Sequence, residues 1–173
     1  YPVLRRGNME SLQLIRENLL RSKAIVLARI EEMEEHCLTP PHSRGGCHTL
    51  WILGHLAFIE GLVIHDFMQG ETNPRAGWKS LFDGDFISID QADYPTFQQV
   101  LSACRAARMA TIDRLDALTE SELDQAGRNV PADAMNLLGT WRHCFQYCAD
   151  HWLMHRGHLA NARSAAGLQK MWY

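Results

Sequence analysis

The residues with the clearest chemical potential are three histidines in two apolar segments. His151 and His155 are four residues apart in HWLMHRGHL, residues 151–159. Side chains at this spacing lie on one face of a helix, so both imidazoles can reach a single metal ion. His55 lies in the middle of a second apolar segment, where a buried imidazole needs polar partners. If the two segments pack against each other, the three histidines form one site.

A site of three histidines suits a first-row divalent metal such as Zn, Ni, Fe or Mn. Three protein ligands leave a coordination position open, which is typical of catalytic metals and not of closed structural sites. At that position a metal can lower the pKa of a bound water or thiol, or polarise a carbonyl. The pattern therefore predicts a metal site with access for a small molecule, but it identifies no catalytic side chain.

The other histidines have weaker claims on the site. His48 lies two turns before His55 on nearly the same face, which makes it a reserve ligand or a partner of a ligand. His158 follows His155 by one turn, and we expect it to donate to or accept from a ligand. Surface positions are expected for the remaining four: His36, His42, His65 and His143.

Cysteine provides an alternative ligand type. Cys144 and Cys148 continue the same helical stripe toward His151, so a mixed Cys/His site stays open as a competing idea. A disulfide between them is disfavoured, because i and i+4 positions on one helix rarely give the required dihedral. The chain has five cysteines and no visible secretion signal, which favours reduced thiols and a cytoplasmic location.

Composition limits the class of protein. The 173 residues, 46% hydrophobic and 21% charged, fit one soluble domain covering residues 1–173. The 17 basic residues do not outnumber the 20 acidic ones or form a basic run, so no nucleic acid partner is expected. The longest apolar run, residues 50–64, is shorter than the ~20 residues that cross a bilayer, so no membrane span is expected.

Apolar positions recur at helical spacing in four segments, residues 8–36, 48–69, 94–118 and 136–166. Gly70 is a plausible end signal for the second, and Thr119 with Glu122 has capping-box spacing for an extra turn. No convincing alternation at period two is present. The expected fold is all-α, a four-helix bundle with a long connection, residues 71–93, between the second and third helices.

Two motifs carry a resemblance to a known family. LWILGHLAFIEG, residues 50–61, and HWLMHRGHLANARSAAG, residues 151–167, resemble the DinB/YfiT-like superfamily of metal-binding four-helix proteins. The connection FMQGETNPRAGWKSLF, residues 67–82, is also similar. The resemblance implies a metal triad at the matching positions, which are His55, His151 and His155. The usual Gln of the family motif is replaced here by His158, which leaves the triad intact.

The resemblance implies a right-handed bundle with a long crossover, a frequent homodimer, and thiol-dependent transferase or isomerase chemistry with mycothiol, bacillithiol or glutathione. The first hypothesis is therefore a metal-bound low-molecular-weight thiol that attacks an electrophile. A second is metal-assisted hydrolysis with Glu60 or Asp66 as the general base. A third is a non-catalytic metal that ties helices together, or a stress-related bundle. A carboxylate-bridged di-iron site is disfavoured, because paired Glu-x-x-His motifs are missing.

Overall fold

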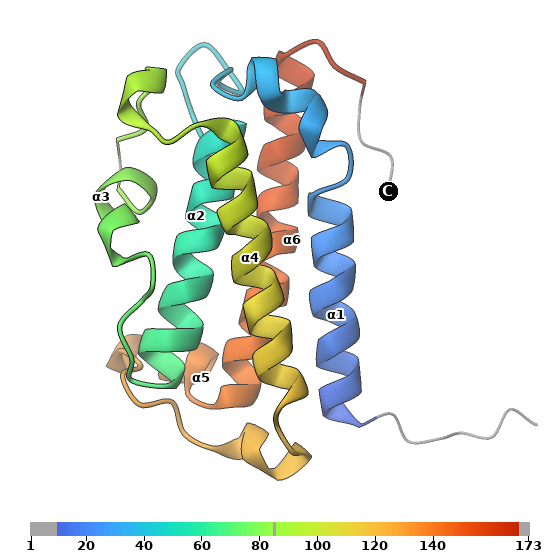
Figure 1. Cartoon of the computed structure of the whole chain (residues 1–173), viewed down its shortest axis with the longest axis vertical. Helices are drawn as coiled ribbons and strands as arrows, with labels where there is room; N and C mark the ends of the chain where they lie inside the picture. The colour runs from blue at the N-terminus through green and yellow to red at the C-terminus, as the bar shows by residue number, and fades with distance from the viewer. Residues whose placement is uncertain (1–9, 85, 170–173) are drawn as a thin grey trace, which may run out of the picture.

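The fold is a bundle of helices. The computed structural model describes residues 10–84 and 86–169, and within these ranges it contains no strand. Its long helical segments lie side by side (Figure 1): α1 Ser11–Val26, α2 Thr49–Gly61 with its π-helical continuation Leu62–Met68, α4 Phe97–Asp116 and α6 Trp141–Ala165. The expected all-α bundle is confirmed.

Short helical elements occupy the connections. The two short α-helices are α3 Lys79–Phe82 and α5 Met135–Leu138. The 3-10 turns are Ile30–His36, Ala76–Trp78, Gln91–Asp93, Glu120–Asp124 and Ala132–Ala134. α2 packs against α4 and α6, and α1 packs against α6 and α4. The two helices that carry the candidate ligands, α2 and α6, are therefore neighbours.

Local sequence signals mark several helix ends. Thr96 caps α4, where its side chain accepts a hydrogen bond from the backbone N–H of Gln99 in a capping box. Thr119 and Glu122 form the predicted capping box. Gly70 follows the π-helical segment with a φ of 72°, a left-handed conformation that glycine adopts at low cost.

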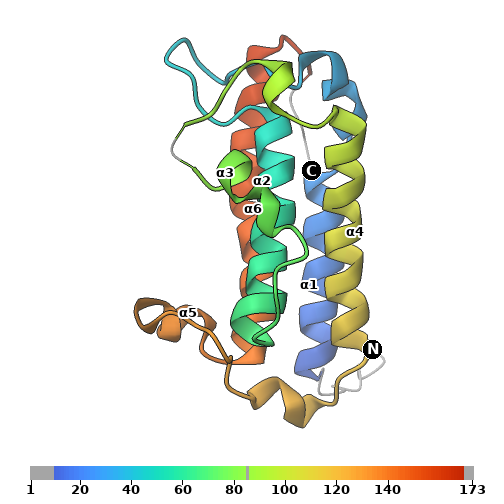
Figure 2. The same cartoon turned by 60° about the vertical axis from the view of Figure 1, so that its left-hand side comes forward.

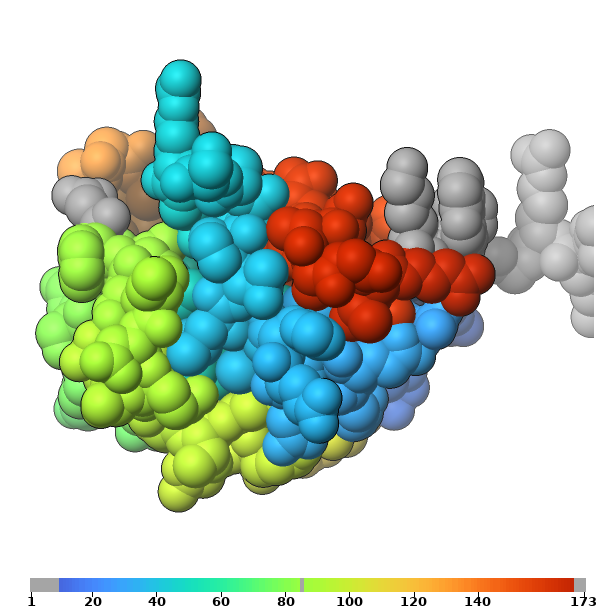
Figure 3. Space-filling model, turned by 90° about the horizontal axis from the view of Figure 1, so that it is seen from above, coloured from blue at the N-terminus to red at the C-terminus, as the bar shows by residue number. Residues whose placement is uncertain are grey.

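The first predicted helix, residues 8–36, is wrong beyond Val26. Arg29 adopts a left-handed backbone with a φ of 55°, and Ile30–His36 turns away as a 3-10 helix. The buried Arg163 of α6 donates to the carbonyl of Arg29, 3.2 Å away, and pairs with Glu32. Figure 3 shows this turn (blue) against the end of α6 (red). A contact from the other end of the chain therefore fixes this break; residues 8 and 9 lie outside the described ranges.

The fourth predicted helix, residues 136–166, is divided in two. α5 ends at Leu138, and the extended Thr140 starts α6 by accepting a hydrogen bond from the N–H of His143. Leu137 lies on α5 and is 57% exposed. α5 stands away from the bundle beside the start of α6 (Figure 2).

The segment Thr49–Met68 is more apolar than expected. Its 20 helical residues and its mean hydropathy of 1.4 are sufficient, by length and composition alone, to cross a membrane. The expectation that this region is too short to do so is wrong. However, 67% of the apolar window is buried inside the bundle, as in the core helix of a folded domain.

A buried ion pair joins the long helices. Nε of Arg108 on α4 lies 2.9 Å from Oε1 of Glu60 on α2, and both side chains are almost fully buried. The indole N–H of Trp152 on α6 donates to Glu60 at 2.7 Å. The Arg108 guanidinium also donates to the carbonyls of Leu19 on α1, at 3.2 Å, and of Cys148 on α6, at 2.8 Å. One polar network therefore reaches all four long helices.

Replacing one member of this pair should strongly destabilise the fold. Arg108→Met leaves the Glu60 carboxylate buried without its cation, which should lower the free energy of unfolding by about 3–5 kcal/mol. The matched control is Arg105→Met on the same helix, because Arg105 pairs with Glu31 at the surface. It should cost less than about 1 kcal/mol. Urea unfolding measures both; equal losses would contradict the role of the buried pair.

Candidate metal centre

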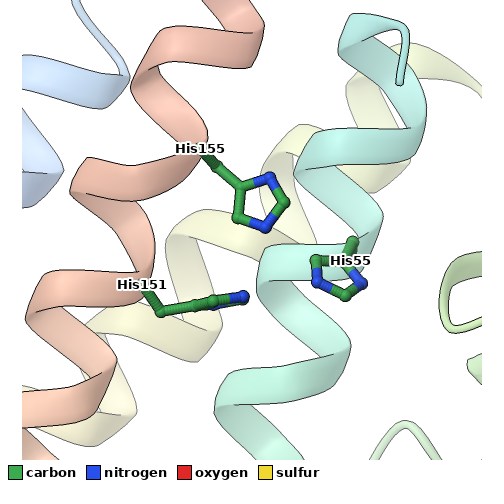
Figure 4. Close-up of side chains that lie close together, drawn as sticks. All are labelled: His55, His151 and His155. Atoms are coloured by element: carbon green, nitrogen blue, oxygen red, sulfur yellow. The ribbon is translucent and has the colours of Figure 1, made fainter. Parts of the chain in front are cut away.

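α2 and α6 bring the three predicted ligands together. One nitrogen from each of His55, His151 and His155 lies within 4.8 Å of the other two. The rings project toward one another from the facing helices (Figure 4). His151 and His155 are buried and His55 is partly exposed. The residues from two distant segments thus form one cluster with access from the side of His55.

The orientation of His55 is set by the connection between α2 and α4, which contains α3. Its Nδ1 donates to the backbone carbonyl of Phe82 at 2.6 Å, which leaves Nε2 with a free lone pair. Phe82 is fully buried at the end of α3 and packs directly over Gly54, where any Cβ would overlap its ring. Trp51 stacks on the His55 ring at 4.6 Å and 12°. Glycine at position 54 therefore allows the approach that orients the neighbouring histidine.

The two histidines of α6 are oriented by their own helix. Nδ1 of His155 lies 3.3 Å from Nδ1 of the exposed His158. One of these nitrogens donates and the other accepts; for His155 to keep a free Nε2, its Nδ1–H is the donor. Tyr147 stacks on His151 with ring centroids 5.4 Å apart and planes 13° apart. The expected contact between His158 and a ligand is therefore present.

The electrostatic environment keeps the three imidazoles neutral. Burial lowers the pKa of His151 to about 3, helped by the charges of His55 and Arg108. Burial and the neighbouring histidines lower the pKa of His155 to about 3. Burial also lowers the pKa of His55, against the opposing effects of the Phe82 carbonyl and Asp83. Neutral imidazole is the form that binds metal.

These residues fit a divalent metal ion. Metal–imidazole bonds of about 2.1 Å allow two ligand nitrogens to lie up to about 4.2 Å apart, so nitrogens within 4.8 Å need only small ring rotations. The donor set is made of neutral nitrogens with at least two rings held by hydrogen bonds. Zn, Ni, Fe and Mn all accept such ligands. Three ligands leave room for an exogenous group.

His48 has a structural role in place of the one expected. It is fully buried and caps α2, because its Nδ1 accepts a hydrogen bond from the N–H of Trp51 at 3.1 Å. Its Nε2 donates to the carbonyl of Ser88 at 2.8 Å. Both ring nitrogens are therefore used, and His48 is not part of the cluster. The expectation of a reserve ligand is wrong.

The cysteines do not extend the site. Cys144 donates its thiol to the carbonyl of Leu138 at 3.2 Å, and burial raises its pKa to about 12. Burial also raises the pKa of Cys148 well above its usual value. Within the described ranges, the group of potential ligands around His151 contains no cysteine. A mixed Cys/His site therefore lacks support.

The two carboxylates considered as general bases are already used elsewhere. Glu60 binds Arg108 and Trp152 in the core, and Asp66 accepts a hydrogen bond from Asn129 at 3.0 Å near the surface.

Sequence reasoning missed the Phe82 carbonyl, which has no sequence signal of its own. The one available hint was Gly54, a glycine inside a helical segment.

Comparison with known proteins supports the same interpretation. A family model described as the DinB superfamily matches residues 18–159, which include all three histidines of the cluster. No curated protein and no solved structure matches the chain. The match therefore identifies a family but provides no relative with a described reaction.

Substitution of His48 separates helix capping from metal binding. His48→Ala should lower the free energy of unfolding by about 1 kcal/mol, because it removes the N-cap of α2. His48→Asn should recover part of this loss, since asparagine is a good N-cap. Both variants should keep the bound metal of the parent protein in elemental analysis. Loss of metal in His48→Asn would instead identify His48 as a ligand.

The stability of the metal-free protein should fall in acid. An unfolded histidine takes up a proton near pH 6.5, whereas His151 and His155 in the folded chain do so only near pH 3. Between these values the unfolded state binds more protons, so the free energy of unfolding decreases as the pH falls from 6.5 toward 3. Urea unfolding at a series of pH values should show a smaller decrease of the free energy of unfolding in His155→Gln. An unchanged dependence on pH would contradict the low pKa of His155.

Proposed function

The chain belongs to the DinB superfamily, and on this premise we propose that His55, His151 and His155 hold a divalent metal ion at which a low-molecular-weight thiol is bound and transferred to an electrophile. The observation that carries the proposal is the cluster itself, three neutral imidazoles whose nitrogens lie within 4.8 Å of one another. When bound, such an ion lowers the pKa of a coordinated thiol.

A polar cavity along α2, which none of the three histidines lines, supports a polar thiol as the substrate. This cavity of about 350 Å³ lies along α2 and the start of the crossover, and its charged or amide-bearing lining residues include Asp66, Lys79, Asp83 and Asn129. Asp83 directly follows Phe82, whose carbonyl orients His55. Thiols such as mycothiol, bacillithiol and glutathione carry hydroxyl, amide or charged groups that require such partners. Asp83 also lies close enough to His55 for its charge to oppose the lowering of the pKa of that ring, so the sulfur would reach the cluster past this end of the cavity.

The transfer is balanced without a redox partner. The thiol sulfur forms a bond to the electrophilic carbon, and the leaving group departs with the electron pair of its bond to that carbon. The proton that the thiol releases balances the negative charge of the leaving group. The chain's part is to keep the imidazoles neutral through burial and to hold His55 through Phe82. No oxidant or reductant is needed.

Hydrolysis is a weaker alternative. It requires a general base near the metal. Of the two carboxylates considered, Glu60 is bound by Arg108 and Trp152, and Asp66 is hydrogen-bonded to Asn129. A metal that only ties α2 to α6 is the remaining alternative.

We also propose a cytoplasmic location and a homodimer. The cysteines of the described ranges are all free thiols, which fits a reducing compartment.

Cobalt substitution tests both parts of the proposal. The purified protein should bind Co²⁺, and His55→Ala or His151→Ala should abolish binding, because each removes one of three ligands. Addition of glutathione, bacillithiol or mycothiol to the cobalt protein should produce a thiolate-to-cobalt charge-transfer band. Metal analysis and absorption spectroscopy measure these outcomes.

His143→Ala is the matched control, because His143 is an exposed histidine on the same helix as His151. It should keep both the metal and the absorption band. Absence of metal from the folded parent protein would reject the metal centre. Metal binding without a band for any of the three thiols, together with a large loss of melting temperature on chelation, would favour the purely structural metal.

A further inference from the structure

A second cavity opens beside the histidine cluster. It has a volume of about 390 Å³ and lies between α5 and the outer face of α6. His151, a member of the cluster, forms part of its wall together with Tyr147. Because Tyr147 also stacks on His151, a molecule in this cavity lies directly beside the candidate metal centre. Cavities of about 300–1,000 Å³ are typical of small-molecule sites.

The chemistry of this cavity differs from that of the polar cavity on α2. Leu137 and Met154 line it and are 57% and 59% exposed, so two large apolar side chains face an open space. Tyr147 adds an aromatic surface. Asp150 and His143 supply polar groups, and no lysine or arginine is among the residues that line the cavity. These walls favour an apolar, neutral or cationic molecule and disfavour an anion.

The separation of α5 from α6 creates this cavity. Leu137 would lie on the inward stripe of an uninterrupted helix, but the break at Thr140 places it opposite Met154 across the opening. Methionine is flexible and adapts its shape to different apolar ligands. The break therefore produces a site that a regular helix could not provide.

We propose that this cavity, formed by Leu137, Tyr147, Met154 and Asp150 beside His151, binds the electrophile, and that the electrophile is a small uncharged or cationic molecule with an aryl or alkyl body. The inference rests on the proposed thiol transfer and adds the substrate class. The polar thiol and the apolar electrophile then occupy two different cavities.

Fluorine NMR with para-fluorobenzyl alcohol tests the site directly and without turnover. The ligand signal should broaden on addition of the protein, and para-fluorobenzoate should bind about tenfold more weakly because Asp150 repels its carboxylate. Asp150→Asn should reduce this preference. Met154→Lys and Leu137→Lys should each weaken binding of the alcohol by about tenfold, since each places a charge on an apolar wall. Leu14→Lys, at an exposed leucine on α1, is the matched control and should bind as the parent does.

Three results would overturn the proposal. One is absence of binding to the folded parent protein, and another is binding that neither lysine variant weakens. The third is a dimer in sedimentation that Met154→Lys dissociates while the parent binds no alcohol, because a second copy would then cover the cavity.

Loading with Co²⁺ in place of Zn²⁺ separates this inference from the proposed function. If the cavity adjoins the metal, the paramagnetic ion should broaden the fluorine signal of the bound alcohol more strongly. Binding with the expected variant effects in a protein that holds no metal would reject the thiol transfer and keep the cavity. Metal and thiol binding without alcohol binding would reject the cavity alone.

Discussion

The fold depends on one buried guanidinium. Arg108 neutralises the carboxylate of Glu60 and uses its remaining N–H groups on backbone carbonyls of two further helices. Burial of two charges is costly, and such a pair is tolerated when its geometry satisfies most hydrogen-bonding groups. Packing of apolar stripes is compatible with several rotations of each helix. The directional hydrogen bonds of Arg108 restrict these rotations. His151 also lies close enough for the guanidinium charge to lower the pKa of His151.

The candidate site combines burial with restraint by hydrogen bonds. Two of its imidazoles have hydrogen-bond partners, Phe82 for His55 and His158 for His155, and each partner selects a tautomer. Burial removes the proton that would compete with a metal. The cavity that His151 lines is largely apolar, and the cavity along α2 is polar. A metal held by the cluster would therefore have a largely apolar cavity on its His151 side.

Much of the site followed from the sequence because His55, His151 and His155 lie on regular helices, where apolar periodicity identifies the buried face. The breaks at Arg29 and Thr140 did not follow from periodicity. The first depends on Arg163 from the far end of the chain, and the second on a local cap that overrides an apolar pattern. The acceptor for His55 is a backbone carbonyl, which any residue type can provide, so composition and spacing do not identify it.

The contact between Gly54 and Phe82 links the cluster to the crossover. The connection between α2 and α4 has no long helix among its described residues, and α3 spans only 4 residues. Its docked position nevertheless supplies the acceptor that holds His55. A local opening of the crossover would release this ring, so ligand affinity and crossover docking are thermodynamically linked. Any ion that needs an ordered His55 therefore also protects the backbone amides around Phe82 from exchange with solvent.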